Sequence, residues 1–407
     1  MASNRENQQA AMEEEGKQFE FHADELENIL SHVPLVDLVS ASRVSKSWGD
    51  AVSSSLRHHS PPRPWLILHA HAATAHAYDP RSGLWIKISQ PVKTYAAGGL
   101  RSSHSSFVYM LSSSRFSFSS DPLNLDWHHA DPPLVWRQDP IVARVGDFVV
   151  VAGGGCDFGD EPLAVEIYDL KTRAWRFCDS MPGNIRDSPA SSWLSIAVAA
   201  EKLIVAEKSS GQMHSFDPET NSWCGPFDLR IGEAKSIIDY SIGCSNNSLI
   251  VVALCRIKNV ERVKIWRGVG DEFECEEIGE MPLEYVAKLK SDSLGECNSI
   301  NVRVGGNIVY VYSDMWNVEE VVACELVGGG GCRWWSVRNA VAREKTAERL
   351  VCTCAEVGID ELQRANNVRF EYLVRDLQQR MSRRTSGSSY PTFAIGASEQ
   401  VTDVPSG

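Results

Sequence analysis

Residues 78–85, with the sequence YDPRSGLW, return in altered form as YDLKTRAW at 168–175 and as FDPETNSW at 216–223. In each copy a tryptophan lies six residues after an aspartate, and a further Asp-Pro pair keeps that interval without the preceding aromatic residue. The repeated positions are Tyr78, Asp79 and Trp85; Asp121 and Trp127; Tyr168, Asp169 and Trp175; and Phe216, Asp217 and Trp223. The four aspartates are 42, 48 and 48 residues apart, a period typical of β-propeller blades.

A β-rich run precedes each of these units, and the same kind of run appears twice more toward the C-terminus. The runs are residues 65–69, 107–111, 148–152, 202–206, 249–254 and 308–312. The last two repeats are degenerate, with third strands at 263–266 and 323–326, and Trp334-Trp335 ends the sixth. We therefore expect six four-stranded blades, because a single such sheet cannot bury its own two faces.

The repeated residues have physical roles in such a blade. We expect each aspartate to cap the turn between the third and fourth strands. We expect each tryptophan to fill the wedge between adjacent blades. Gly153 and Gly154 would permit a tight backbone turn at a strand end.

The two ends of the propeller are predicted to meet. The first repeat shows three strands, and a strand-like run at 349–357 is left over after the sixth. We predict that this run completes the first blade and closes an all-β propeller over residues 65–357. Beyond it we expect a helix within 358–380 and a disordered, Ser/Gly-rich tail at 381–407. The helical spacing is that of Phe370, Leu373, Val374 and Leu377.

The N-terminal part has a helical pattern instead. Residues 1–18 are polar and are expected to be a disordered lead-in. After them, Asp24 and Glu27 have the spacing of a capping box, and Pro34 ends the first helix. One face of that helix carries Leu26, Ile29, Leu30 and Val33.

Two more short helices follow. The second is expected to carry Leu35, Leu38 and Val39, and the third Val44, Trp48, Val52 and Leu56. Together the three helices predict a small all-α module over residues 19–58. Residues 59–64, with their prolines and histidines, break the helical pattern and are predicted to be a linker.

Composition excludes several classes of partner. The chain of 407 residues has a net charge of −13 and no long Lys/Arg stripe, so nucleic acid is not expected to bind. No apolar run approaches the roughly 18 to 20 residues that cross a bilayer, so no membrane partner is expected. Eleven cysteines are scattered along the chain, and no secretion signal follows the first methionine. We therefore expect free thiols in the cytosol or nucleus.

No catalytic, cofactor or metal site is predicted. Most of the eleven histidines precede residue 130, which does not favour a copper site. Cys352 and Cys354 are too close in sequence for a zinc pair and are interpreted as buried free thiols. Residues 328–331 are a glycine run without the Gly-Lys-Ser/Thr of a phosphate loop. A Ser-His-Asp triad can be assembled from distant segments, but no Gly-x-Ser-x-Gly elbow is present.

The helical module resembles the F-box. The resemblance covers residues 19–58, and its most specific part is the Val-Ser-Lys-x-Trp element at 44–48. The sequence departs from the family at Phe21-His22, where Leu-Pro is usual. The resemblance implies an apolar surface for a Skp-type adaptor, with Pro34 and Leu38 exposed, although some of its residues must form the module's own core. The residues implied are Leu26, Ile29, Leu30, Val33, Pro34, Leu38, Val44 and Trp48.

The repeats resemble kelch repeats. Their glycine doublet is clear at Gly153-Gly154 and weaker at Gly305-Gly306. Together the two patterns are similar to the plant F-box/kelch family. That resemblance implies a non-catalytic substrate adaptor of an SCF (Skp, cullin, F-box) ubiquitin ligase, whose propeller binds a target protein through loops at one mouth.

The linker and first blade also resemble one group within this family. Residues 64–66 and 78–80 are similar to members that send phenylpropanoid or flavonoid enzymes, such as phenylalanine ammonia-lyase or chalcone synthase, for degradation. Two alternatives stay open. One is a kelch scaffold whose helices bind no adaptor, and the other is a propeller enzyme with convergent polar residues in a deep axial pocket.

Overall fold

The described helices and strands of the protein belong to one unit, Met1–Tyr372. The lead-in, most of the linker and the tail lie outside the described residues. The computed structural model describes residues 22–58, 63–71, 74–89, 99–121, 123, 126–154, 164–185, 193–231, 236–270, 273–290, 296–313, 319–328, 331–340, 350–365 and 368–373.

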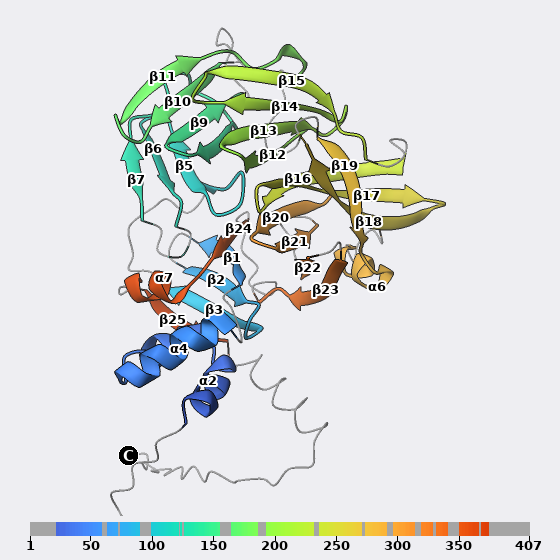
Figure 1. The fold of residues 1–407 in the computed structure, drawn as a ribbon. Helices are drawn as coiled ribbons and strands as arrows, with labels where there is room; N and C mark the ends of the chain where they lie inside the picture. The colour runs from blue at the N-terminus through green and yellow to red at the C-terminus, as the bar shows by residue number, and fades with distance from the viewer. Residues whose placement is uncertain are drawn as a thin grey trace, which may run out of the picture. The chain divides into compact units, whose positions relative to one another are not determined.

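Helices come first, as the sequence predicts. They are α2 (Ala23–Ser31), α3 (Leu35–Ala41) and α4 (Lys46–His58), shown in blue in Figure 1. The predicted capping box is wrong, because His22 is the N-cap of α2 and makes no side-chain cap hydrogen bond. Asp24 lies inside the first turn, where its charge favours the helix dipole. Val44, expected in the third helix, precedes α4.

Six antiparallel sheets follow in the described part of the chain and form the blades of a propeller (Figure 1). Their inner strands are β24 (Val351–Glu356), β4 (Leu100–Arg101), β8 (Ile141–Val145), β12 (Leu194–Ala199), β16 (Ile237–Ser245) and β20 (Asn301–Gly305). The second strands are β1 (Pro64–His71), β5 (Val108–Ser112), β9 (Phe148–Ala152), β13 (Lys202–Glu207), β17 (Ser248–Ile257) and β21 (Ile308–Tyr312). Five of the six β-rich runs of the sequence fall within these second strands, and the run 107–111 begins one residue before β5.

The outer half of each blade contains the repeated motif. The third strands are β2 (Thr74–Asp79), β6 (Arg115–Ser119), β10 (Val165–Asp169), β14 (Gln212–Asp217), β18 (Val260–Val269) and β22 (Glu320–Val327). The fourth strands are β3 (Leu84–Ser89), β7 (His128–Ala130), β11 (Ala174–Cys178), β15 (Ser222–Asp228), β19 (Glu274–Glu280) and β23 (Gly331–Arg338). The short helices η1 (Gly183–Ile185), α6 (Leu283–Val286) and η3 (Ala287–Leu289) lie between blades in sequence.

The C-terminal strand closes the first blade, as predicted. β24 pairs with β1, with Leu66 opposite Cys354, and supplies the inner strand that the first repeat lacks. The chain then forms helix α7 (Ile359–Arg364) and returns as β25 (Arg369–Tyr372) on the outer edge of β3. The helix expected at Phe370 is therefore wrong, because Phe370 lies in a strand opposite Ile88.

The repeated aspartates cap the turns between third and fourth strands. The carboxylates of Asp79, Asp169 and Asp217 accept hydrogen bonds from the backbone N–H groups two and three residues later, at 2.7 to 3.4 Å. Asp121 accepts one such bond, from the N–H of Leu123 at 3.0 Å. Each side chain thereby satisfies backbone donors that the sheet leaves unpaired.

The repeated tryptophans join neighbouring blades. The indoles of Trp85, Trp175 and Trp223 pack on the aromatic residue of their own repeat, with ring centroids 4.8 to 5.5 Å apart. Each of these three donates from Nε1 to a carbonyl of the preceding blade or the segment after it. The acceptors are Arg338 for Trp85 (3.0 Å), Asp131 for Trp175 (3.0 Å) and Asp179 for Trp223 (3.2 Å). The tryptophans thus make specific polar contacts between blades. Trp127 is half-buried.

The two glycine doublets differ in position. Gly153 and Gly154 follow β9 with φ of 61° and 89°, and a Cβ on Gly154 would lie 2.6 Å from the carbonyl oxygen of Gln138. Gly305 instead ends β20, and Gly306 lies in the turn between β20 and β21. The second doublet is therefore not the equivalent of the first, although a Cβ on Gly305 would also clash, with Cys354.

Blade 3 contains a buried ion pair. Arg137 Nη2 lies 2.9 Å from Glu166 Oε2, and both side chains are 0% exposed. Glu166 also accepts hydrogen bonds from the backbone N–H groups of Leu134 and Val135, at 2.6 and 3.2 Å. The carboxylate thus connects β10 to the segment before β8 and neutralises a cation that has no access to water.

Candidate functional site

The helical module shares its core with blade 1. Leu26, Leu30 and Leu38 pack in one cluster with Trp65 of β1 and Leu362 of α7. Leu38 is 0% exposed, so the expectation that it lies on an open docking face is wrong. Its burial has a physical cause: three short helices cannot enclose their own apolar residues, and blade 1 with α7 covers the remaining face.

Other predicted docking residues do reach the surface. Ile29 is 49% exposed and Val44 is 63% exposed. Val33, Pro34 and Trp48 are half-buried. Large apolar side chains at the surface of a module otherwise rich in polar residues favour contact with another protein. The structure thus divides the predicted residues into a core set, Leu26, Leu30 and Leu38, and an accessible set, Ile29, Val33, Pro34, Val44 and Trp48.

One arginine ties the helical module to the propeller. Arg81 lies in the turn after β2 and donates from Nη1 to the carbonyl of Val33 and from Nη2 to those of Leu30 and Ser31, both at 3.1 Å. These carbonyls belong to the C-terminal end of α2 and the residues just after it, where intrahelical partners are lacking and a positive charge is favoured. We name these contacts the Arg81 joint.

Elements from the C-terminal part support the same junction. Helix α7 packs on α3, and Gln363 Nε2 donates to Ser42 Oγ at 3.3 Å. Because β24, α7 and β25 all follow the propeller in sequence, the end of the described chain contacts both its first helices and its first blade. No feature of the sequence pointed to Arg81, whose acceptors are backbone carbonyls some 50 residues away.

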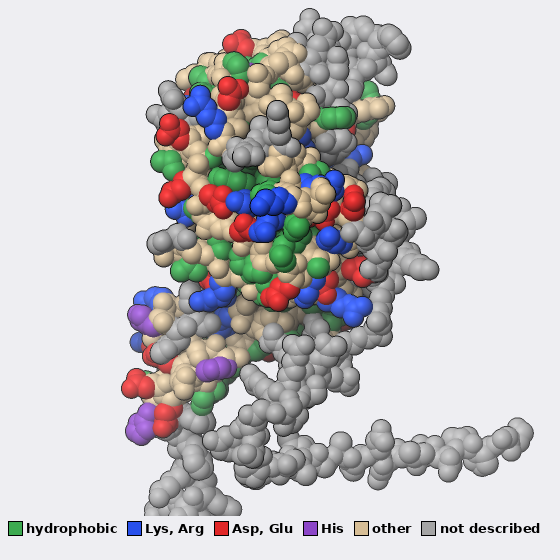
Figure 2. Space-filling view, turned by 90° about the vertical axis from the view of Figure 1, so that its right-hand side faces the viewer, with side chains coloured by type: hydrophobic (Ala, Val, Ile, Leu, Met, Phe, Trp, Pro, Cys, Tyr) green, Lys and Arg blue, Asp and Glu red, His purple; other side chains and the backbone are tan. Residues whose placement is uncertain are grey.

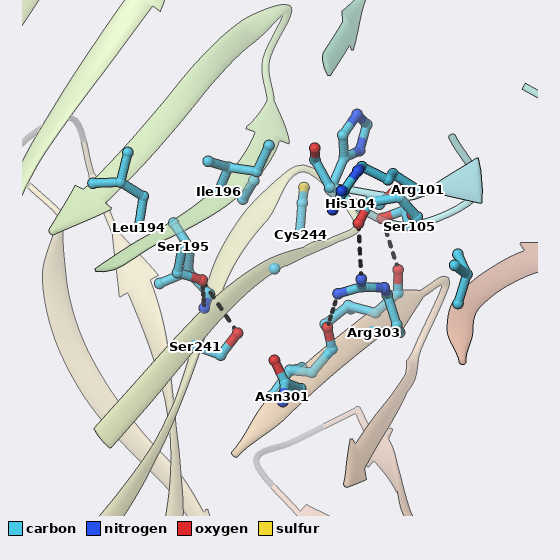
Figure 3. Close-up of a pocket in the computed structure, with 18 of the residues that line it drawn as sticks. Arg101, His104, Ser105, Leu194, Ser195, Ile196, Ser241, Cys244, Asn301 and Arg303 are labelled. Atoms are coloured by element: carbon cyan, nitrogen blue, oxygen red, sulfur yellow. Dashed lines mark hydrogen bonds between the residues drawn. The ribbon is translucent and has the colours of Figure 1, made fainter. Parts of the chain in front are cut away.

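A second feature is a cavity between the inner strands, of about 90 Å³ (Figure 3). The first residues of β12, β20 and β24 contribute to it, namely Leu194, Asn301 and Val351. Hydroxyl groups gather there: Ser195 Oγ lies 3.1 Å from Ser241 Oγ and accepts from the N–H of Ile242 at 2.9 Å. Polar groups therefore line part of the cavity wall.

Two of the cations at the cavity have acidic partners. Lys208 Nζ lies 3.1 Å from Asp239 Oδ1, and both side chains are largely buried. Arg101 Nη1 lies 3.8 Å from Asp139 Oδ1 and is more exposed. Each pair is formally neutral, so neither gives the cavity a net charge.

Arg303 differs from these two. It is 8% exposed and bonds only to carbonyl oxygens: Nε to Cys352 at 2.8 Å, Nη1 to Val302 at 2.9 Å and Nη2 to Ser102 at 3.3 Å. It forms no ion pair with any residue that the structure describes. Nearby, burial and, to a smaller extent, the Arg303 charge lower the pKa of His104 to about 4, so this imidazole is neutral.

The described residues contain no group of His, Cys, Asp or Glu that could hold a metal ion, and no helix long and apolar enough to cross a membrane. Cys352 and Cys354 are buried free thiols, as predicted. On the face shown in Figure 2, acidic and basic side chains are interspersed, and the described residues form no continuous basic band there.

Comparison with known proteins supports this division into helices and propeller. The F-box domain family matches residues 23–60, which include all three helices. An F-box/kelch-repeat protein from Arabidopsis thaliana is 42% identical over 370 residues, covering 85% of this chain and 93% of the relative. The chain belongs to the F-box/kelch-repeat family.

Membership of the F-box/kelch-repeat family accounts for both motifs and for their order in the chain. A solved structure, a proposed 6-phosphogluconolactonase from Bacteroides fragilis, is 11% identical with a TM-score of 0.38, covering 73% of this chain and 99% of that one. No property of this chain is inferred from that similarity.

Proposed function

We propose that this F-box/kelch-repeat protein is the substrate-recognition adaptor of an SCF-type ubiquitin ligase. The F-box binds a Skp-type adaptor, which links the chain to a cullin scaffold, and the propeller holds a target protein for ubiquitination and proteasomal degradation. We place this function in the cytosol or nucleus, where such ligases work and where free cysteines stay reduced.

The exposure of Ile29 and Val44 carries the proposal. Both are large apolar side chains on the F-box, and both remain open to solvent although the rest of the module buries its leucines against blade 1. Burying the remaining exposed part of these side chains under a partner helix would contribute about 1–2 kcal/mol each. In this family the F-box contacts a Skp-type adaptor, and that adaptor would cover Ile29 and Val44.

The test is co-purification with a Skp-type adaptor. An Ile29→Glu/Val44→Glu double variant should fold, because both positions already face solvent, but should lose adaptor binding by at least tenfold. The matched control is Leu134→Glu/Val327→Glu, two apolar propeller residues with 68% and 41% exposure. Equal adaptor binding by the F-box variant and the control would contradict the proposal.

Leu38 is unsuitable for this test. Removing a side chain that is 0% exposed would cost about 2–5 kcal/mol of stability, so lost binding could reflect an unfolded F-box. Substitution at Ile29 and Val44 avoids that ambiguity. If the wild-type chain itself bound no Skp-type adaptor, a kelch scaffold outside any ligase would be the better description.

The adaptor function requires no chemistry from this chain. Holding the target beside the ubiquitin-carrying enzyme makes transfer effectively intramolecular, because the target is present at high effective concentration. The catalytic steps belong to other subunits. A propeller enzyme would be favoured over this proposal if the isolated chain turned over a small substrate and lost that activity on substitution of Arg303.

The target class follows from the resemblance of the first blade to family members that send phenylpropanoid or flavonoid enzymes for degradation. We assign the target to the phenylpropanoid or flavonoid biosynthetic enzymes, with chalcone synthase and phenylalanine ammonia-lyase as the proteins to test. The residues that carry this resemblance, such as Trp65, Tyr78 and Asp79, are buried, so they shape the scaffold rather than touch a target. Binding of neither enzyme to the purified chain would overturn this assignment and leave the adaptor function intact.

A further inference from the structure

The described residues at the cavity between the inner strands carry a net positive charge. Lys208 and Arg101 are paired with Asp239 and Asp139, but Arg303 has only neutral partners among the described residues. A buried cation without a counter-ion is costly, and carbonyl dipoles offset only part of that cost. Arg303 therefore favours an anion within its reach.

The chemistry around Arg303 suits an oxyanion. A guanidinium has five N–H donors, and the three hydrogen bonds to carbonyls leave two of them. His104 Nε2 accepts from the N–H of Arg144 at 3.3 Å, so the neutral ring carries its proton on Nδ1 and has a donor there. Serine hydroxyls, including those of Ser195 and Ser241, lie on other walls of the same cavity (Figure 3).

The volume limits the size of the ligand. The cavity of about 90 Å³ has room for several water-sized groups. That is enough for a carboxylate or phosphate group with a short stem.

The position of the cavity decides which mouth of the propeller is involved. It runs from the start of β12, β20 and β24 as far as Cys244 and Val304, which it shares with a second cavity. That second cavity lies at the opposite ends of these strands, at Val198, Gly305 and Glu356. In blade 1, Glu356 pairs with Pro64, at the end where β2 turns toward Arg81. The cationic cavity therefore extends to the end of the propeller opposite the end of blade 1 that bears the Arg81 joint.

We infer that Arg303 makes this cavity a binding site for one small oxyanion, a carboxylate or phosphate group, entering through the mouth where the inner strands begin. In a ligase the oxyanion is an acidic side chain of the target protein, and this assignment of its source rests on the proposed function. A free phosphate or phosphate ester offers the same chemistry. The site itself does not depend on the ligase assignment.

The test measures binding to the full chain by calorimetry at low ionic strength. The probes are inorganic phosphate, the blocked pentapeptide Gly-Gly-Glu-Gly-Gly and its neutral counterpart with glutamine. We expect at least tenfold tighter binding of one anionic probe than of the glutamine peptide. The tighter of the two anionic probes identifies the source. Equal binding of the anionic and neutral probes would overturn the inference.

Variants then locate the site. Arg303→Gln should remove the preference for the anion, whereas Arg333→Gln should keep it, because Arg333 lies on the outer strand of the same blade and is paired with Glu325. An unchanged preference in folded Arg303→Gln would contradict the inference. If Arg303→Gln does not fold, Arg101→Gln replaces it, because loss of the cation beside Asp139 lowers the net charge of the described cavity residues to zero. A reduced preference supports the site and an unchanged one overturns it.

Failure of this inference differs from failure of the proposed function. Adaptor binding depends on Ile29 and Val44 of the F-box, far in sequence from Arg303. A chain that binds the Skp-type adaptor but shows no anion preference would remain a ligase adaptor without an oxyanion site. A chain that prefers the anion but binds no adaptor would retain the site and lose the ligase assignment.

Discussion

The buried carboxylate of Glu166 stabilises blade 3. Its carboxylate neutralises Arg137 and accepts two backbone hydrogen bonds, with no exposure to solvent. Replacing it with alanine leaves a buried cation and two N–H groups without partners. We expect Glu166→Ala to lower the free energy of unfolding by about 3–5 kcal/mol, measured by urea denaturation.

The control for this change is a surface ion pair. Lys171 Nζ lies 2.6 Å from Asp147 Oδ2, but the two side chains are 75% and 51% exposed. Water screens such a pair, so Lys171→Ala should leave the unfolding midpoint unchanged. A similar loss of stability in both variants would show that the burial of Glu166 has no special energetic role.

A second prediction concerns pH. Hydrogen bonds from the backbone N–H groups of Thr172 and Lys171 hold the pKa of Asp169 below its usual range. A lowered pKa in the folded state stabilises the fold above the unfolded pKa of about 3.9, and this contribution is lost as the pH falls through the folded value. Asp169→Asn should therefore show a smaller drop in thermal midpoint than wild type between about pH 5 and pH 2. Parallel curves would contradict this account.

The sequence predicts the structural roles of some residues but not of others. Asp79, Asp169 and Asp217 recur at fixed spacing from a tryptophan, so their turn-capping role was visible as a pattern. Arg81 and Arg303 occur once each and bond to backbone carbonyls of distant segments. Neither a repeat nor a charge pattern marks such residues, because the fold alone brings their partners together.

Among the elements, the Arg81 joint offers a direct test of how the F-box is attached. Arg81→Ala removes the donors to the carbonyls at the end of α2 without altering the F-box sequence. Losing these charge-assisted bonds should cost about 1.5–3 kcal/mol locally. We expect faster amide hydrogen exchange in residues 23–31 and unchanged exchange in blades 3 to 5. Arg144→Ala, an exposed arginine of β8, is the control.

Strands were more predictable than the elements that follow the propeller. All six second strands appear as β-rich runs, because both faces of a blade are buried and the runs are continuously apolar. Phe370 was assigned to a helix because residues 370–377 have helical spacing. Pairing with β3, with Phe370 opposite Ile88, decided the outcome in favour of a strand. Such tertiary pairing cannot be seen in local periodicity.

For the whole molecule, ring closure by β24 is the main requirement for stability. β24 supplies the inner strand of blade 1 and pairs with β1 over six residues. Deleting residues 350–407 would expose the edge of β1 and the apolar side chains beside it. We expect that deletion to give unfolded or aggregated protein by circular dichroism and light scattering. Deletion of 381–407 alone should leave the unfolding midpoint unchanged, and a folded 350–407 deletion would contradict the closure.

The proposed function requires one complex, formed by this chain, a Skp-type adaptor and a cullin. The most direct measurement is size-exclusion chromatography with light scattering on the purified chain mixed with a Skp-type adaptor and the N-terminal part of a cullin. We predict one complex that contains the three proteins in equal numbers, and its loss with Ile29→Glu/Val44→Glu. Separate elution of the folded wild-type chain from the other two proteins would contradict the claim that it is a ubiquitin-ligase adaptor.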